Sequence, residues 1–280
     1  MENIIVILDA NKPKLQLIDF SCYLANLGHA KLTAYFIEKM IGDDMPRQKL
    51  LFALPYVDTI TASDIEENKK NAIQYAENEK AFCEGCQNRG ISVQVMRNRQ
   101  TTLEQLIIES RFADLIVLDP EISFDDAGEN ILSHNVEQFI HQAECPVMVA
   151  PYAFYGIDEI IFSYDGSKSS VFAIKAFIQL FPELSNLKAT ALQITEGEAI
   201  RFRENTKVMQ LITSHFPSVQ FMQLTGKASD QLFSYLIDKN RVVLVLGAYG
   251  RGFSSMMFRP SIARLIVKTL NLPVFISHPN

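Results

Sequence analysis

Short runs of apolar residues alternate along the chain with segments whose apolar residues recur every three or four positions. The runs are typical of strands buried on both faces, and the periodic segments are typical of helices with one apolar stripe. In the first half the predicted strands are residues 3–9, 32–37, 91–96, 114–118 and 145–150, and the predicted helices are residues 15–27, 63–87, 102–110 and 128–143. Strands that alternate with helices predict a parallel sheet covered on both faces.

The order of elements begins again after residue 156. The matching segments are residues 3–9 with 159–165, 15–27 with 170–180, 92–96 with 218–222, and 145–149 with 272–276. Because the matches keep their order, the sequence predicts two tandem α/β domains, residues 1–151 and residues 156–280. The first copy is longer between its second and third strands, where residues 41–60 form an insertion.

Composition narrows the class of protein. A chain of 280 residues exceeds the usual size of one core, which agrees with two domains. The net charge of −6 argues against nucleic acid as the main partner, since binding to a phosphate backbone normally needs a basic face. No apolar run approaches the ~20 residues that span a bilayer, and the start of the chain has no basic flank or cleavage signal. We therefore expect a cytoplasmic protein without a membrane segment.

Cysteines and histidines provide weak motifs. Two of the four cysteines form the motif Cys83-Glu-Gly-Cys86, which is compatible with redox chemistry or with half of a zinc site. The motif lies late in a charged helical pattern, without a second CxxC or an HxxxH nearby, and this favours coincidence within a helix. The five histidines are scattered, so no metal site is predicted.

The segment with the clearest chemical content begins at the apolar run Val242–Leu246. The run ends in a glycine-rich turn that starts at Gly247, and Ser261 then opens a helical pattern. A strand, a glycine loop and a helix N-terminus form an anion site in α/β proteins, because free backbone N–H groups and the helix dipole face the loop. Arg251, Arg259 and Arg264 add positive charge with no acid between them, which favours an anion, although solvated arginines are the alternative.

On these residues the chain resembles a tandem universal stress protein over nearly its whole length. The resemblance rests on Asp165-Gly-Ser, on the loop Leu246-Gly-x-x-Gly250-Arg, on the helix start at Ser261 and on the final strand Leu272-Pro-Val-Phe-Ile276. It implies two Rossmann-like domains of the adenine-nucleotide α-hydrolase type, each a five-stranded parallel sheet between helices. It also implies that the domains pair through their final strands as an intramolecular pseudo-dimer, with room for a further homodimer and a protein partner of unknown kind.

Some members of this family bind ATP, with Mg²⁺, and the resemblance carries their site to six positions. These positions are Asp165, Gly247, Gly250, Arg251, Arg259 and Ser261. Asp165 would accept hydrogen bonds from a ribose or an adenine edge, or would be only a helix N-cap or turn residue. The two glycines would let the main chain approach phosphates, or would form a plain turn, and Ser261 would bind a phosphate or only cap its helix.

Pro260 departs from the family pattern Gly-x2-Gly-x9-Gly-Ser/Thr, because it replaces the third glycine. Proline has no N–H to donate to a phosphate and cannot adopt a positive φ. In the first half the equivalent segment, residues 119–129, has lost both loop glycines and carries five acids and no base. We therefore expect the first site to be empty and Asp9, the counterpart of Asp165, to be a structural remnant. Mg²⁺ or Ca²⁺ is an alternative ligand for the acids, but their spacing shows no ordered ligand set.

Three functions follow as hypotheses. The first is a stress-response or signalling protein that binds ATP or a related nucleotide in its second domain. The second is a nucleotide-free scaffold for a protein partner. The third, a slow nucleotide hydrolase, has the least support, because the loop lacks the lysine of a P-loop and no Glu or His is evidently placed as a base. The family has no agreed enzymatic reaction, and we expect this chain not to be an enzyme.

Overall fold

The computed structural model describes residues 1–10, 16–37, 48–51, 54–57, 62–96, 102–119, 134–195, 205–248 and 266–279. The elements of the first half are β1 (Asn3–Asp9), α1 (Gln16–Gly28), β2 (Lys31–Ile37), β3 (Gln48–Leu51), β4 (Leu54–Val57), α2 (Ala62–Gln87), β5 (Val93–Met96), α3 (Leu103–Ser110), β6 (Leu115–Leu118), α4 (His134–Gln142) and β7 (Val147–Val149). The elements of the second half are β8 (Glu159–Ser163), α5 (Lys168–Leu180), the 3₁₀-helix η1 (Pro182–Leu184), β9 (Lys188–Thr195), α6 (Asn205–Thr213), β10 (Val219–Thr225), α7 (Ala228–Leu236), β11 (Val242–Gly247), the π-helix η2 (Ile266–Leu270) and β12 (Val274–Ser277).

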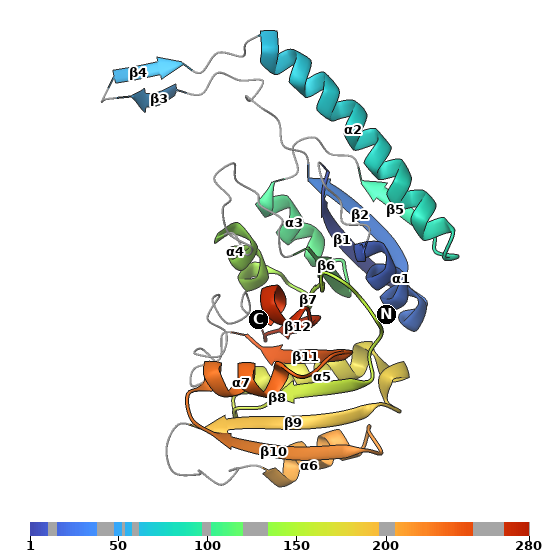
Figure 1. The fold of residues 1–280 in the computed structure, drawn as a ribbon, viewed down its shortest axis with the longest axis vertical. Helices are drawn as coiled ribbons and strands as arrows, with labels where there is room; N and C mark the ends of the chain where they lie inside the picture. The colour runs from blue at the N-terminus through green and yellow to red at the C-terminus, as the bar shows by residue number, and fades with distance from the viewer. Residues whose placement is uncertain are drawn as a thin grey trace.

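A single sheet of ten strands runs through the molecule (Figure 1), in the order β10-β9-β8-β11-β12-β7-β6-β1-β2-β5. Within each half of this ten-stranded sheet the described neighbouring strands are parallel, and the central pair, β7 and β12, is antiparallel. Met148 lies opposite Phe275 in that pair. The two halves are therefore related by an approximate twofold axis that crosses the sheet between these residues. The predicted fold of two five-stranded parallel domains is confirmed, and they pair through their final strands.

Helices cover both faces of the sheet, as the continuous apolar runs predict. On one face alternate strand residues such as Ile160 and Phe162 pack beneath α1, α2, α5 and α6. On the other face residues such as Ile161 and Leu244 pack beneath α3, α4 and α7. Strands buried on both sides have no polar face to alternate with, which explains why the sequence shows runs rather than a period of two.

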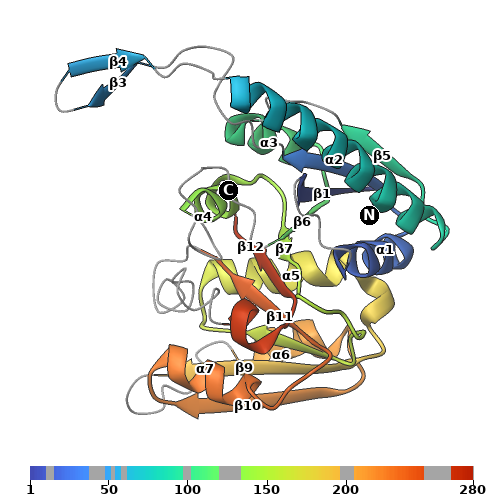
Figure 2. The same ribbon diagram turned by 45° about the horizontal axis from the view of Figure 1, so that its top comes forward.

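The insertion and the helix boundaries are the places where the structure adds to the prediction. Within residues 41–60 the described part forms an antiparallel hairpin of β3 and β4, which projects away from the sheet beyond the start of α2 (Figures 1 and 2). The helix predicted over residues 128–143 is present as α4, and residues 128–133 lie outside the described part of the chain. Among the described helices, none is both long and apolar enough to cross a membrane.

The first half ends with β7 at Val149, and the second begins with β8 at Glu159. The connection between them contains the predicted junction near residues 151–156. The limits of the two domains, residues 1–151 and residues 156–280, stay a prediction.

Candidate functional site

The candidate site lies where the direction of strand progression reverses. From β8 the chain continues outward to β9 and β10, and it then crosses back to add β11 on the other side of β8. In an open parallel sheet such a switch point leaves a crevice beyond the carboxyl ends of the two inner strands, and ligands bind there. Asp165 follows β8 and Gly247 ends β11, so the structure brings these two predicted residues to the same switch point.

Asp165 holds a tight turn with one carboxylate oxygen and leaves the other unused. Its Oδ1 accepts a hydrogen bond of 2.9 Å from the backbone N–H of Ser167, across Gly166, whose φ is +81°. Its Oδ2 is buried and has no hydrogen-bond partner within the described residues. A buried acceptor without a partner is costly, and native structures usually satisfy such atoms. Oδ2 is therefore available to a hydroxyl or amino donor from a ligand.

The cap of helix α5 is a neighbouring residue. Ser167 is the N-cap, and its Oγ accepts a hydrogen bond of 3.1 Å from the backbone N–H of Ser170. The N-cap interpretation of Asp165 is therefore wrong, because the hydroxyl two residues later satisfies the helix start. The turn interpretation is correct.

Gly247 has a packing role of its own. A Cβ built on Gly247 would lie closer to the backbone of Ser169 and Ser170 than real Cβ atoms approach other atoms. The end of β11 therefore contacts the first turn of α5 backbone to backbone, and only glycine permits this approach. Packing of the strand against the helix explains this glycine even without a ligand.

The other four predicted site residues, Gly250, Arg251, Arg259 and Ser261, lie outside the described residues. Pro260 and Arg264 also lie there. Their proposed contacts with phosphate stay predictions, and the site rests here on Asp165 and Gly247.

The structure adds two polar residues that sequence reasoning missed. Gln193 and Thr195 belong to the last three residues of β9, the strand next to β8. Gln193 Oε1 and Thr195 Oγ1 are buried and, like Asp165 Oδ2, have no hydrogen-bond partner within the described part of the chain. One signal could have indicated Gln193, because it places a polar side chain between Leu192 and Ile194.

The corresponding edge of the first half is built differently. Ala10 replaces the turn glycine, and its carbonyl accepts a hydrogen bond of 2.8 Å from Asn78 Nδ2 of helix α2. Asp119, which is 5% exposed, stands at the position of Gly247. The close contact between strand and helix seen in the second half is therefore not reproduced, since aspartate carries a Cβ. The remainder of the acidic segment, residues 120–129, lies outside the described residues.

The CxxC motif places its second cysteine inside the core. Cys86 of α2 is buried against Cys22 of α1, and the two thiols share a hydrogen bond. The hydrogen bond from Cys86 lowers the pKa of Cys22, burial opposes the shift, and Arg89 lowers the pKa further. Within the described residues, no group of three or more His, Cys, Asp or Glu side chains could hold a metal ion.

The chain matches universal stress proteins over most of its length. It is 22% identical over 246 residues to a universal stress protein of Mycolicibacterium smegmatis, covering 80% of this chain and 81% of that protein. The solved structure of a universal stress protein from Archaeoglobus fulgidus matches with a TM-score of 0.66 at 12% identity, covering 99% of this chain and 98% of that one.

The chain therefore shares the fold of these universal stress proteins along nearly its whole length. A second solved structure, described as a universal stress protein of Pseudomonas aeruginosa, covers 100% of this chain and 94% of its own with a TM-score of 0.63 at 13% identity. No protein-family profile matches the chain.

Proposed function

We propose that the second half binds ATP or a related adenine nucleotide at the switch point between β8 and β11, and that the protein acts in a stress response or in signalling. The observation that supports this is Asp165, whose Oδ2 is buried and lacks a partner within the described residues. Gln193 Oε1 and Thr195 Oγ1 add further buried hydrogen-bonding atoms near the same edge. A ribose and an adenine amino group supply several hydrogen-bond donors, which suits these acceptors.

The remaining residues suit the phosphates. Gly250 and Ser261 offer backbone and hydroxyl donors, while Arg251 and Arg259 offer positive charge to the polyphosphate, which also carries the Mg²⁺ ion. Pro260 removes one backbone donor, and a hydrogen bond to a charged group contributes on the order of 1.5–3 kcal/mol. We therefore expect affinity about ten- to a hundredfold below that of a site with glycine at this position, unless Arg259 compensates.

The second candidate is a nucleotide-free scaffold for a protein partner. It is favoured by Gly247, whose contact with Ser169 and Ser170 explains the glycine without any ligand. The first half supports the same view, because it keeps the fold with Asp119 in the equivalent position. A slow hydrolase remains the least supported function. The cytoplasmic location and a further homodimer stay predictions.

The test is thermal unfolding of the full chain with Mg²⁺ and increasing ATP. A ligand of the folded state must raise its stability, by about 2.7 kcal/mol at a hundred times the Kd. Asp165→Asn keeps an oxygen that can accept from Ser167 N–H but can present an NH₂ group in place of Oδ2. We expect it to weaken ATP binding about ten- to a hundredfold. Asp9→Asn, the same change at the counterpart, should leave binding unchanged.

Two results would contradict the proposal. If millimolar ATP leaves the midpoint of the wild-type protein unchanged, the second half is not a nucleotide site and the scaffold is favoured. If Asp165→Asn and the wild-type protein show equal shifts, ATP binds elsewhere.

A further inference from the structure

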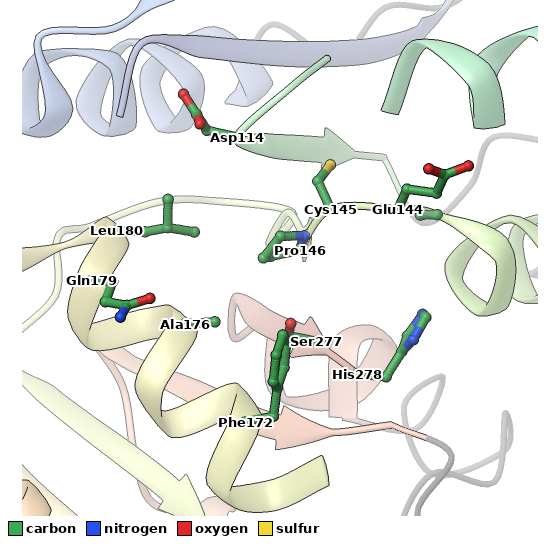
Figure 3. Close-up of a pocket in the computed structure, with 11 residues that line it drawn as sticks. Asp114, Glu144, Cys145, Pro146, Phe172, Ala176, Gln179, Leu180, Ser277 and His278 are labelled. Atoms are coloured by element: carbon green, nitrogen blue, oxygen red, sulfur yellow. The ribbon is translucent and has the colours of Figure 1, made fainter. Parts of the chain in front are cut away.

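A cavity of about 310 Å³ lies between the two halves, beside the end of β12 (Figure 3). Phe172 and Ala176 of helix α5 form one wall, and Cys145 and Pro146, just before β7, form the opposite wall. His278, which follows β12, lies at one side. The lining is mainly apolar, which is typical of pockets for small organic molecules.

The approximate twofold axis identifies a second groove equivalent to this cavity. With Asp9 matched to Asp165, the buried positions of α1 and α5 coincide, and Phe20 and Tyr23 correspond to Ala176 and Gln179. Pro146 and Pro273 correspond as well, because each immediately precedes its half's final strand, β7 or β12. The groove beside α1 and Pro273 is therefore the counterpart of the cavity beside α5 and Pro146.

The counterpart groove is filled by the connection between the halves. The ring of Phe154 packs against Phe20 and Tyr23, with ring centroids 5.0 and 4.8 Å apart. Asn271 holds the adjacent backbone, accepting from the N–H of Ala153 at 2.8 Å and donating to its carbonyl at 3.0 Å. An aromatic ring is thus what this type of groove accommodates.

Exposure shows the difference between the two sites. Phe20, beneath Phe154, is 0% exposed, whereas its counterpart Ala176 is half-buried and Phe172, one turn before it, is 41% exposed. Within the described part of the chain, no ring contact at Ala176 and Gln179 matches the one that Phe154 makes with Phe20 and Tyr23. The cavity is therefore the unfilled copy of a groove whose occupant is known.

The polar groups of the cavity select against charged ligands. The guanidinium of Arg111 donates to Oε1 and Oε2 of Glu144, at 2.6 and 2.8 Å. Asp114 Oδ2 accepts a hydrogen bond of 3.0 Å from the backbone N–H of Asn3. Burial lowers the pKa of His278, so this side chain is neutral at pH 7 and offers a hydrogen bond rather than a charge. The two carboxylates oppose an anion, and Arg111 already compensates the charge of Glu144.

We propose that this cavity binds a neutral small molecule with one or two aromatic rings. A cavity of about 150 Å³ lined by apolar side chains holds benzene, and pockets for larger ligands begin near 300 Å³. A volume of about 310 Å³ therefore suits a substituted ring or a bicyclic compound. The ring takes, beside Ala176 and Gln179, the place that Phe154 takes beside Phe20 and Tyr23.

Binding can be measured by ¹⁹F NMR with 4-fluorobenzyl alcohol as a neutral probe. We expect the wild-type protein to broaden the probe signal at millimolar concentration. Ala176→Phe fills the cavity from a half-buried position and should abolish the broadening. Ala81→Phe, the same change on an exposed position of helix α2, should leave it intact. Absence of broadening with the wild-type protein, or equal broadening with Ala176→Phe, would overturn the proposal.

A second variant tests the equivalence of the two grooves. Phe154→Ala opens the groove beside α1, so the number of bound probe molecules in equilibrium dialysis should rise from one to two. A value that stays at one would contradict the argument from the counterpart. The Ala176→Phe protein should respond to ATP as the wild-type protein does, so failure of this proposal and failure of nucleotide binding are distinguishable.

Discussion

At the scale of single residues, Gly247 has two explanations that were inseparable in the sequence. A glycine at the end of a strand is compatible with close approach of a phosphate, and it is equally compatible with close approach of a helix. The structure shows the helix contact, because the backbone of Ser169 and Ser170 occupies the space that a Cβ would need. The nucleotide proposal therefore rests more on Asp165 than on this glycine.

Gly247→Ala should destabilise the protein in the absence of any ligand. The new methyl group meets backbone atoms that cannot rotate away, and overpacking of this kind costs about 1–3 kcal/mol. Gly85→Ala is a suitable control, because its Cβ meets side-chain atoms alone, the nearest being the Cδ1 end of Ile18 at 2.8 Å, and alanine favours a helix over glycine by about 1 kcal/mol. Urea denaturation should show a lower midpoint for Gly247→Ala alone; equal midpoints would show that the strand end moves freely.

Glu159 is a buried carboxylate at the opposite end of β8. It accepts hydrogen bonds from Thr190 at 2.7 Å and from Lys239 at 2.8 Å, and Lys188 lies 3.1 Å away. Burial alone would raise the pKa of Glu159, but the three donors outweigh it and lower the pKa. The ionised form is thus the one that the fold stabilises. Its counterpart in the first half is the neutral Asn3, bonded to Thr33 at 3.3 Å.

Glu159→Gln should therefore cost stability in a pH-dependent way. A carboxyl whose pKa is depressed by folding stabilises the fold above its unfolded pKa, near 4.3, and loses this effect as the pH falls through its folded pKa. At pH 7 we expect the variant to be less stable by about 1–3 kcal/mol, since Lys239 loses a charged acceptor. The difference in free energy of unfolding between the wild-type protein and the variant should narrow below about pH 4. Urea denaturation at both pH values checks this. A difference that does not depend on pH would mean that the charge of Glu159 contributes nothing to stability.

At the scale of elements, the strands were the most predictable part of the molecule. Runs such as Val242–Leu246 are apolar throughout because helices cover both faces, and this pattern needs no knowledge of distant contacts. The hairpin of β3 and β4 was not predicted, because strands of four residues are too short to show a clear period of apolar residues. Contacts between distant segments, such as Phe154 on Phe20 or Cys22 on Cys86, leave no local signal and became visible only in the structure.

The central strand β12 should be the most sensitive element to truncation. Phe275 is fully buried, and its ring packs edge to face against Phe177 at 5.3 Å and Phe181 at 6.2 Å. Phe275→Ala should therefore lower the free energy of unfolding by about 3–5 kcal/mol. Phe112→Ala, the same change at a side chain that is 70% exposed, should cost no more than about 0.5 kcal/mol. Similar losses from the two variants in urea denaturation would contradict the position of Phe275 in the shared core.

At the scale of the whole molecule, the antiparallel pairing of β7 with β12 directs the carboxyl edges of the two halves in opposite directions. The turn at Asp165 and its counterpart at Asp9 therefore lie at opposite edges of the sheet. A substitution at the carboxyl edge of the first half, such as Asp119 in place of glycine, therefore does not change the carboxyl edge of the second half. The two copies can differ in chemistry while they share one core.

Joining the halves in one chain has a further consequence, which follows from the place of Phe154. In a dimer of identical subunits, true twofold symmetry obliges both grooves to be alike, so both are filled or both are open. A covalent connection breaks that obligation, because a single crossing can cover only one of them. Fusion thus leaves one groove filled by Phe154 and the other open to a ligand. Each chain then binds one ligand molecule, and cooperativity between two equivalent sites cannot arise.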